Sequence, residues 1–344
     1  LFVAACGGSS DVTTPTTTAT PTTTAAPTTT AVDPWGTKVT TPMEMFYASD
    51  VPVQVRTLLE EALTAAANEW GNYGPLEYWV AGIDVTAAEE LADQYCTRRF
   101  DRFEREDKSE CLQYDQTVKL FPELAAAAAE SIETGRASSN AARIGARHWG
   151  IHLFSSSYPF GFAGLLGVPF ADDQTVAFHE YFHAVQTAHI FTHDWDDRDE
   201  MMGPAWFIEG GAEFMAQTTS QRLRDSGTLT ASTWNSLATR MEWKMNSVKE
   251  YIAANPGAKI SDIGYGPDQG IVYDYGTWVH AFLANLHGPD ALLDSFYANL
   301  NDLGWEGAFT HAYGITPDAL YPVFDQFLDL PIEKQLSILP IHGQ

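Results

Sequence analysis

The chain has 344 residues, enough for one or two domains with a substantial core, and 45% of its residues are hydrophobic. It carries 19 Lys and Arg against 45 Asp and Glu, which gives a formal net charge of −26. This excess of negative charge argues against nucleic acid or an anionic membrane face as a partner, because the surface field repels phosphate.

The N-terminal residues resemble the start of a bacterial lipoprotein. Val-Ala-Ala at positions 3–5 precedes Cys6 as in a lipobox, so residues 1–5 are expected to be the remnant of a signal peptide. Residues 6–34 then form a lipid-anchored stalk, because a stretch made mostly of Thr, Pro, Ala and Ser cannot bury enough apolar surface to fold. Since no later run reaches the roughly 18 apolar residues of a spanning helix, we expect an extracytoplasmic protein, at the cell surface or in the periplasm, that lipid on Cys6 holds at the membrane. The alternative is an ordinary signal peptide followed by an unpaired Cys6.

The other two cysteines, Cys96 and Cys111, enclose a charged stretch at residues 97–110. Export places the protein in an oxidising compartment, where this pair is expected to form a local disulfide. A metal site is the weaker explanation, because no His that would complete one lies between residues 1 and 147.

Hydrophobic periodicity predicts an α+β protein. Apolar residues recur at helical spacing from Val55 to Trp70, and Gly-Asn-Tyr-Gly-Pro at 71–75 ends that helix. The elements expected after it are a strand at 76–83, helices at 87–96 and 122–134, and a strand at 150–156. Helices dominate from there to the C-terminus, so a small sheet beside a helical half is expected. The folded part is accordingly divided into an N-terminal α+β region, residues 35–149, and a C-terminal region, residues 150–344.

The strongest chemical pattern lies at residues 175–186, Thr-Val-Ala-Phe-His-Glu-Tyr-Phe-His-Ala-Val-Gln, which have helical periodicity and contain no Gly or Pro. His179 and His183 are four residues apart, so on a helix both imidazoles lie on one face and can reach one ion. Zinc prefers such nitrogen ligands in tetrahedral geometry, and a catalytic site keeps the fourth position for water. Glu180 lies next to His179, where a carboxylate can take a proton from that water. A pair of hydrogen-bonded core histidines is the alternative explanation of this short pattern.

A second block, Pro-Ala-Trp-Phe-Ile-Glu-Gly-Gly-Ala-Glu-Phe at 204–214, strengthens the metal interpretation. Together the two blocks resemble the gluzincin metallopeptidases, whose pattern is His-Glu-x-x-His on one helix and Trp-(Phe/Leu)-x-Glu-Gly-x-Ala-Glu on a second. The resemblance extends over about residues 150–330. It implies a Zn²⁺ ion held by His179, His183 and Glu209.

The resemblance also implies a role for Glu213 and a type of fold. Glu209 and Glu213 are four residues apart and share a helix face, so Glu213 is implied as the acceptor that fixes the tautomer of a ligand histidine. The implied fold is thermolysin-like, with a small mixed N-terminal sheet whose edge strand lies beside the active-site helix, and residues 150–344 are then the catalytic region. The strand at 150–156 is the implied sheet edge, to which an extended peptide would add through main-chain hydrogen bonds.

His189 is an alternative third ligand. It lies six residues after His183, the spacing at which metzincins place their third histidine. That arrangement needs a Gly to break the helix, and this chain has Gln186 at that position. Because the block around Glu209 matches its family pattern at several positions and His189 matches at one, we expect Glu209 to be the ligand.

A further helix is expected to open at Gly270. In gluzincin aminopeptidases a Tyr three residues before a Gly stabilises the oxyanion, and Tyr273 stands in that relation to Gly276. Tyr275 occupies a position where that branch usually has Lys, so a pair of aromatic core residues is the alternative. His280 is a candidate for a second donor, although a single His on a helix face is more often structural.

The sequence thus favours a monomeric, secreted zinc hydrolase that cleaves peptide or protein substrates, with Glu180 as general base. The amino-terminus-binding Gly-x-Met-x-Asn signature of the aminopeptidases is missing, which favours an endopeptidase. Two alternatives stay open: a non-catalytic surface lipoprotein with a vestigial or structural zinc site, and a zinc hydrolase of a non-peptide substrate. A structural site normally has a fourth protein ligand, often Cys, and no Cys lies near the two blocks.

Overall fold

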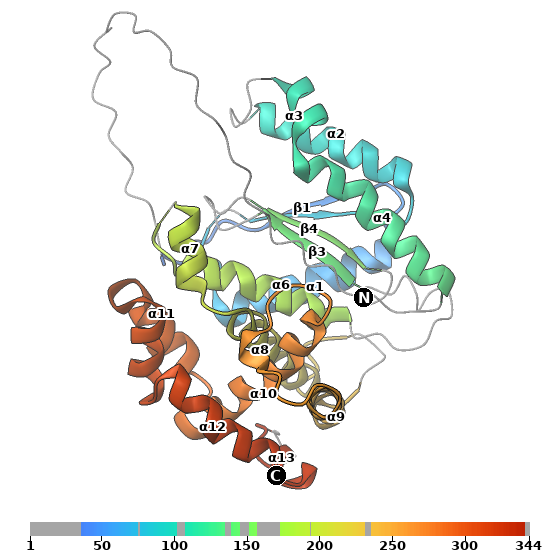
Figure 1. Ribbon diagram of the computed structural model, residues 1–344. Helices are drawn as coiled ribbons and strands as arrows, with labels where there is room; N and C mark the ends of the chain where they lie inside the picture. The colour runs from blue at the N-terminus through green and yellow to red at the C-terminus, as the bar shows by residue number, and fades with distance from the viewer. Residues whose placement is uncertain are drawn as a thin grey trace, which may run out of the picture.

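The structure is a computed structural model that describes residues 36–74, 76–101, 107–134, 139–144, 151–156, 173–192, 194–230 and 235–340 (Figure 1). The expected signal-peptide remnant, the Thr/Pro-rich stalk and the lipidation site Cys6 lie outside the described residues. They therefore stay predictions.

A four-stranded sheet organises the N-terminal part of the chain, in the order β1-β2-β4-β3. Its strands are β1 (Glu44–Tyr47), β2 (Glu77–Val80), β3 (Ser139–Ile144) and β4 (Ile151–Ser156). β1, β2 and β4 are parallel to one another, and β3 is antiparallel to β4. The sheet is therefore mixed, and the two predicted strands are present in shorter form as β2 and β4. The strands β1 and β3 were not predicted.

The prediction of an open sheet edge at 150–156 is wrong, because β4 has a partner on each side. Ile151 pairs with Glu77 of β2 and with Ile144 of β3. The strand β3 escaped prediction because Ser-Asn-Ala-Ala-Arg-Ile contains a single β-branched residue and no regular alternation of apolar and polar side chains. The edge position next to β4 therefore belongs to β3.

Helices cover both faces of the sheet. In chain order they are α1 (Val53–Trp70), α2 (Val85–Asp101), α3 (Lys108–Tyr114), α4 (Gln116–Thr134) and α6 (Asp173–Ala188). Figure 1 shows α2, α3 and α4 on one side of the sheet and α1 with α6 on the other. α4 begins at Gln116 and not at the predicted Pro122, although a Pro inside a helix removes one backbone hydrogen bond. Burial of Phe121 between Tyr95 and Trp79, with ring centroids 5.7 and 6.1 Å away, favours the longer helix.

The predicted disulfide joins Cys96 on α2 to Cys111 on α3, with Cα atoms 5.7 Å apart. Both cysteines are fully buried. α3 starts at a cap in which the Asp107 carboxylate accepts a hydrogen bond from the Ser109 amide at 2.7 Å. A cross-link over a loop of this length contributes about 3 kcal/mol on the chain-entropy account, so it stabilises the packing of α3 on α2.

The C-terminal half is helical, and with the small sheet it gives the predicted α+β class. After α6 its helices are α7 (Trp195–Met202), α8 (Ala205–Asp225), α9 (Leu237–Ala254), α10 (Gln269–His287), α11 (Ala298–Tyr313), α12 (Pro317–Leu328) and α13 (Ile332–Leu336). A 3₁₀ turn at Ile260–Asp262 precedes α10, and a π-helical stretch at Leu292–Tyr297 precedes α11. In the part of the chain that the structure describes, no helix is both long and apolar enough to cross a membrane.

Two glycines set the distance between α8 and α10. A Cβ atom on Gly210 would lie 2.2 Å from the carbonyl carbon of Gly276, and one on Gly276 would lie 2.0 Å from the carbonyl oxygen of Trp206. Any side chain at either position would therefore force the helices apart. The close crossing places the first half of α10 alongside the segment of α8 that carries Glu209.

Candidate metal centre

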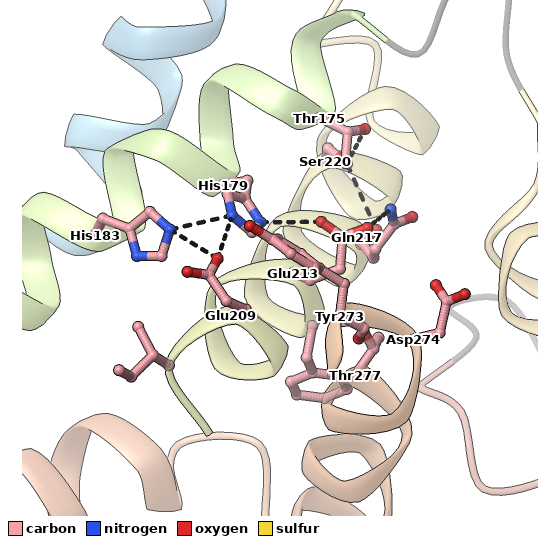
Figure 2. Close-up of polar contacts among 12 residues, drawn as sticks. Thr175, His179, His183, Glu209, Glu213, Gln217, Ser220, Tyr273, Asp274 and Thr277 are labelled. Carbon is pink, nitrogen blue, oxygen red and sulfur yellow. Dashed lines mark hydrogen bonds and ion pairs between the residues drawn. The ribbon is translucent and has the colours of Figure 1, made fainter. Parts of the chain in front are cut away.

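Three side chains from two helices converge at the contact between α6 and α8. The Nε2 atoms of His179 and His183 are 3.1 Å apart, and each lies 3.3 Å from Oε2 of Glu209. Figure 2 shows both imidazoles reaching from α6 toward the carboxylate on α8. The side chains of His179, His183 and Glu209 are 7%, 12% and 3% exposed, so water hardly reaches the cluster. Among the described residues this is the one group that could hold a metal ion.

The dimensions of the triangle fit zinc. Tetrahedral zinc with bonds of about 2.0–2.1 Å keeps its ligand atoms about 3.3–3.4 Å apart. The distances of 3.1, 3.3 and 3.3 Å are close to this value, so an ion can enter without a change of rotamer. Three protein ligands leave the fourth position for water or substrate, as in catalytic zinc sites.

Hydrogen bonds on the far side of each imidazole direct its Nε2 atom to the centre of the triangle. Nδ1 of His179 lies 3.0 Å from Oε2 of Glu213, and Nδ1 of His183 lies 2.7 Å from Oε1 of Gln186. The Gln186 amide is oriented by its NH₂ group, which donates to the carbonyl of Ile208 at 2.9 Å. Because both partners are acceptors, each Nδ1 donates outward, and each Nε2 is the nitrogen that would face a metal ion. The predicted role of Glu213 thus agrees with its position, whereas Gln186 was considered only as the residue that replaces a metzincin glycine.

Glu209 gives an independent reason to expect a cation. Its Oε2 atom is buried, and its neighbours at 3.3 Å are two imidazole nitrogens. A buried carboxylate is costly without a positively charged partner, and a cation between it and the nitrogens supplies that charge. The other oxygen, Oε1, accepts a hydrogen bond from the Tyr265 hydroxyl at 2.7 Å.

In the cluster, the pKa of the histidine His179 is raised and that of the carboxylate Glu209 is lowered, as expected when the two groups attract each other. Burial alone would lower the pKa of His179, but hydrogen bonds with Glu209 and Glu213 outweigh it and raise the pKa to about 10. Burial alone would raise the pKa of Glu209, but His183 and His179 hold that pKa well below its usual range. The metal-free site therefore retains a proton at neutral pH, which an entering metal ion displaces.

A buried network behind Glu213 connects the centre to α9 and α10. Oε1 of Glu213 accepts hydrogen bonds from Gln217 at 2.7 Å and from the Lys244 ammonium at 2.8 Å, and the same ammonium lies 3.1 Å from Asp274. Burial alone would lower the pKa of Lys244, but its two carboxylate partners raise the pKa above its ordinary value. Lys244 therefore stays charged and keeps Glu213 ionised as the acceptor for His179. No local sequence pattern indicated Lys244, which reaches the site from a third helix.

Glu180 and Tyr273 both lie next to His179. Glu180 follows His179 on α6, is half-buried, and its charge contributes to the raised pKa of that histidine. The ring of Tyr273 lies nearly parallel to the His179 ring, with the centroids 5.7 Å apart (Figure 2). Tyr275 instead points into the core, where it is buried and makes an edge contact with Phe324 at 5.2 Å. Of the two tyrosines, only Tyr275 therefore fits the alternative of an aromatic core residue.

Neither of the other two candidate histidines joins the cluster. Nδ1 of His189 bonds the Val185 carbonyl at 2.7 Å, so this histidine closes the end of α6 and lies outside the candidate cluster. Nε2 of His280 bonds the Phe207 carbonyl at 3.0 Å, and burial lowers its pKa to about 4. His280 is therefore a neutral residue of the core, and its candidacy as a second oxyanion donor is wrong.

Comparisons with protein families, with curated proteins and with solved structures find no significant match to this chain.

Replacement of the third ligand provides the first test. We expect Glu209→Ala to lower zinc affinity by more than the roughly 10–100-fold that loss of an outer hydrogen-bond partner costs, because it removes one of three ligand atoms. His189→Ala, the matched control, should leave zinc affinity close to that of the unsubstituted protein. Competition with a chromophoric chelator measures both, with circular dichroism to verify folding. The reverse ranking would transfer the third ligand to His189.

Proposed function

We propose that this protein is a zinc metallopeptidase of the gluzincin type. The observation that carries the proposal is the buried triangle of His179, His183 and Glu209, whose three acceptor atoms have the spacing of one face of a zinc tetrahedron. Zinc, when bound, supplies a Lewis acid that acidifies a water molecule and polarises a carbonyl group. The thermolysin-like character of the fold belongs to the same proposal.

Glu180 is the proposed general base. It follows His179 in sequence, its charge acts on that histidine, and it is half-buried, so its carboxylate belongs to the surroundings of the cluster. Its carboxylate takes the proton of the attacking water and then delivers it to the leaving amine. A metal site that serves only structure normally has a fourth protein ligand, and the described cluster has three. This difference supports an enzyme over a non-catalytic lipoprotein.

Tyr273 is the proposed donor to the oxyanion. Its ring lies against His179, so the side chain is on the side of α10 that faces the centre. The next residue, Asp274, forms an ion pair with Lys244. A donor of this kind stabilises the charge that develops on the carbonyl oxygen when water attacks.

The proposed substrate is a peptide that binds in extended form along β3. This strand holds the edge position that the sequence had given to β4, and main-chain hydrogen bonds to an edge strand recognise a peptide without demanding a sequence. The missing aminopeptidase signature keeps an endopeptidase as the proposed mode. Export and a lipid anchor on Cys6 place the enzyme outside the cytoplasm in this proposal.

Digestion of a mixed peptide library tests the peptidase, with Glu180→Gln as the decisive variant. The unsubstituted protein should cleave peptides, lose activity with a chelator and regain it with zinc. Glu180→Gln should bind zinc normally and lose at least about 100-fold in rate, because the amide cannot accept the proton. Full activity in the variant would disprove the assigned base, and cleavage that a chelator does not affect would disprove the metallopeptidase.

Tyr273→Phe tests the oxyanion donor while it preserves ring volume. We expect kcat to fall on the order of 100-fold or more with a small change in KM, because the hydrogen bond strengthens only in the transition state. Tyr275→Phe is the matched control from the same helix, and its kcat should stay unchanged. Steady-state kinetics on one library substrate measures both. An unaltered kcat in Tyr273→Phe would assign the donor to another residue.

A further inference from the structure

A tyrosine from the segment between α9 and α10 touches the proposed metal centre. Tyr265 lies between the 3₁₀ turn at Ile260–Asp262 and the start of α10. Its hydroxyl donates to Oε1 of Glu209 at 2.7 Å, although 41% of the residue is exposed to solvent. A surface residue thus reaches a carboxylate that is itself only 2% exposed.

The hydrogen bond makes the two oxygens of Glu209 unequal. Oε2 faces the Nε2 atoms of His179 and His183 at 3.3 Å, whereas Oε1 accepts a hydrogen bond from the phenol. A carboxylate can give a metal one oxygen or two, and the second mode would fill the position that a catalytic site keeps for water. A donor fixed on Oε1 opposes that second mode.

We propose that Tyr265 is a positioning residue that restricts Glu209 to one ligand atom and so keeps the fourth metal position open. This inference rests on the proposed metal-dependent function. It assigns to Tyr265 no contact with the reacting atoms, only control over how a ligand is presented.

A phenol suits this task better than a charged donor. Glu213, which does not face the metal position, is held by the Lys244 ammonium at 2.8 Å. The same kind of partner on Glu209 would cancel the negative charge that attracts the metal ion. The neutral Tyr265 hydroxyl satisfies one oxygen and leaves the charge of the carboxylate for the ion.

The test compares Tyr265→Phe with Tyr251→Phe. Tyr251 lies on α9, and its hydroxyl donates at 3.2 Å to Asp268, the last residue of the same segment, and not to Glu209. Each substitution therefore removes one tyrosine hydroxyl that donates a hydrogen bond in this region. Only Tyr265→Phe removes a hydrogen bond to Glu209. Zn²⁺ and Co²⁺ alone are the probes, since visible absorption of bound Co²⁺ weakens as coordination rises from four to five.

For Tyr265→Phe we expect zinc affinity to fall about 10–100-fold and the visible absorption of bound Co²⁺ to weaken as Oε1 turns to the ion. Tyr251→Phe should match the unsubstituted protein in both measurements. An unchanged Co²⁺ spectrum in Tyr265→Phe overturns the inference even if affinity falls, because loss of packing alone would lower affinity without changing the coordination. The peptide-library assay is separate: altered Co²⁺ spectra in a protein that cleaves no peptide would uphold Tyr265 and refute the peptidase. Cleavage with unaltered spectra would do the opposite.

Discussion

The structure around α6 and α8 depends on one electrostatic constraint. Two imidazole lone pairs and a carboxylate oxygen lie within 3.3 Å of one another in a site that solvent hardly reaches. Such acceptors repel each other unless a positive charge lies between them. The surrounding residues increase this demand, because Glu213 and Gln186 accept from the outer nitrogens and so direct the inner ones to the centre. The cluster thus has the arrangement of a candidate cation site.

A packing constraint brings the rest of the chemistry to this point. Gly210 and Gly276 let α8 and α10 meet backbone against backbone, so the first half of α10 lies beside the candidate metal centre. Tyr273 then stacks on His179, and Asp274 shares Lys244 with Glu213. Side chains from α6, α8, α9 and α10 therefore meet around the candidate centre. The glycine contact sets the distance between α8 and α10.

The parts predicted correctly from sequence are those that local spacing determines. His179 and His183 share a face because four residues make about one helical turn, and the same spacing joins Glu209 to Glu213. What depends on contacts between distant segments was missed, including the hydrogen bond of Tyr265 to Glu209. The prediction of the sheet edge was wrong for a related reason. The short strands β1 and β3 have weak strand patterns in the sequence, and they form because they pair with neighbouring strands. The disulfide was predicted correctly because, with Cys6 assigned to lipid, Cys96 and Cys111 were the two cysteines left to pair in an oxidising compartment.

X-ray absorption at the zinc K edge of the zinc-loaded protein measures the centre most directly, because it counts and identifies the atoms around the ion. We predict one zinc per chain with four nitrogen or oxygen neighbours at about 2.0–2.1 Å, including two imidazoles. The two imidazoles would be those of His179 and His183, and substitution of either should remove one from the spectrum. A protein that takes up no zinc, or a zinc ion with six oxygen neighbours and no imidazole, would contradict the account.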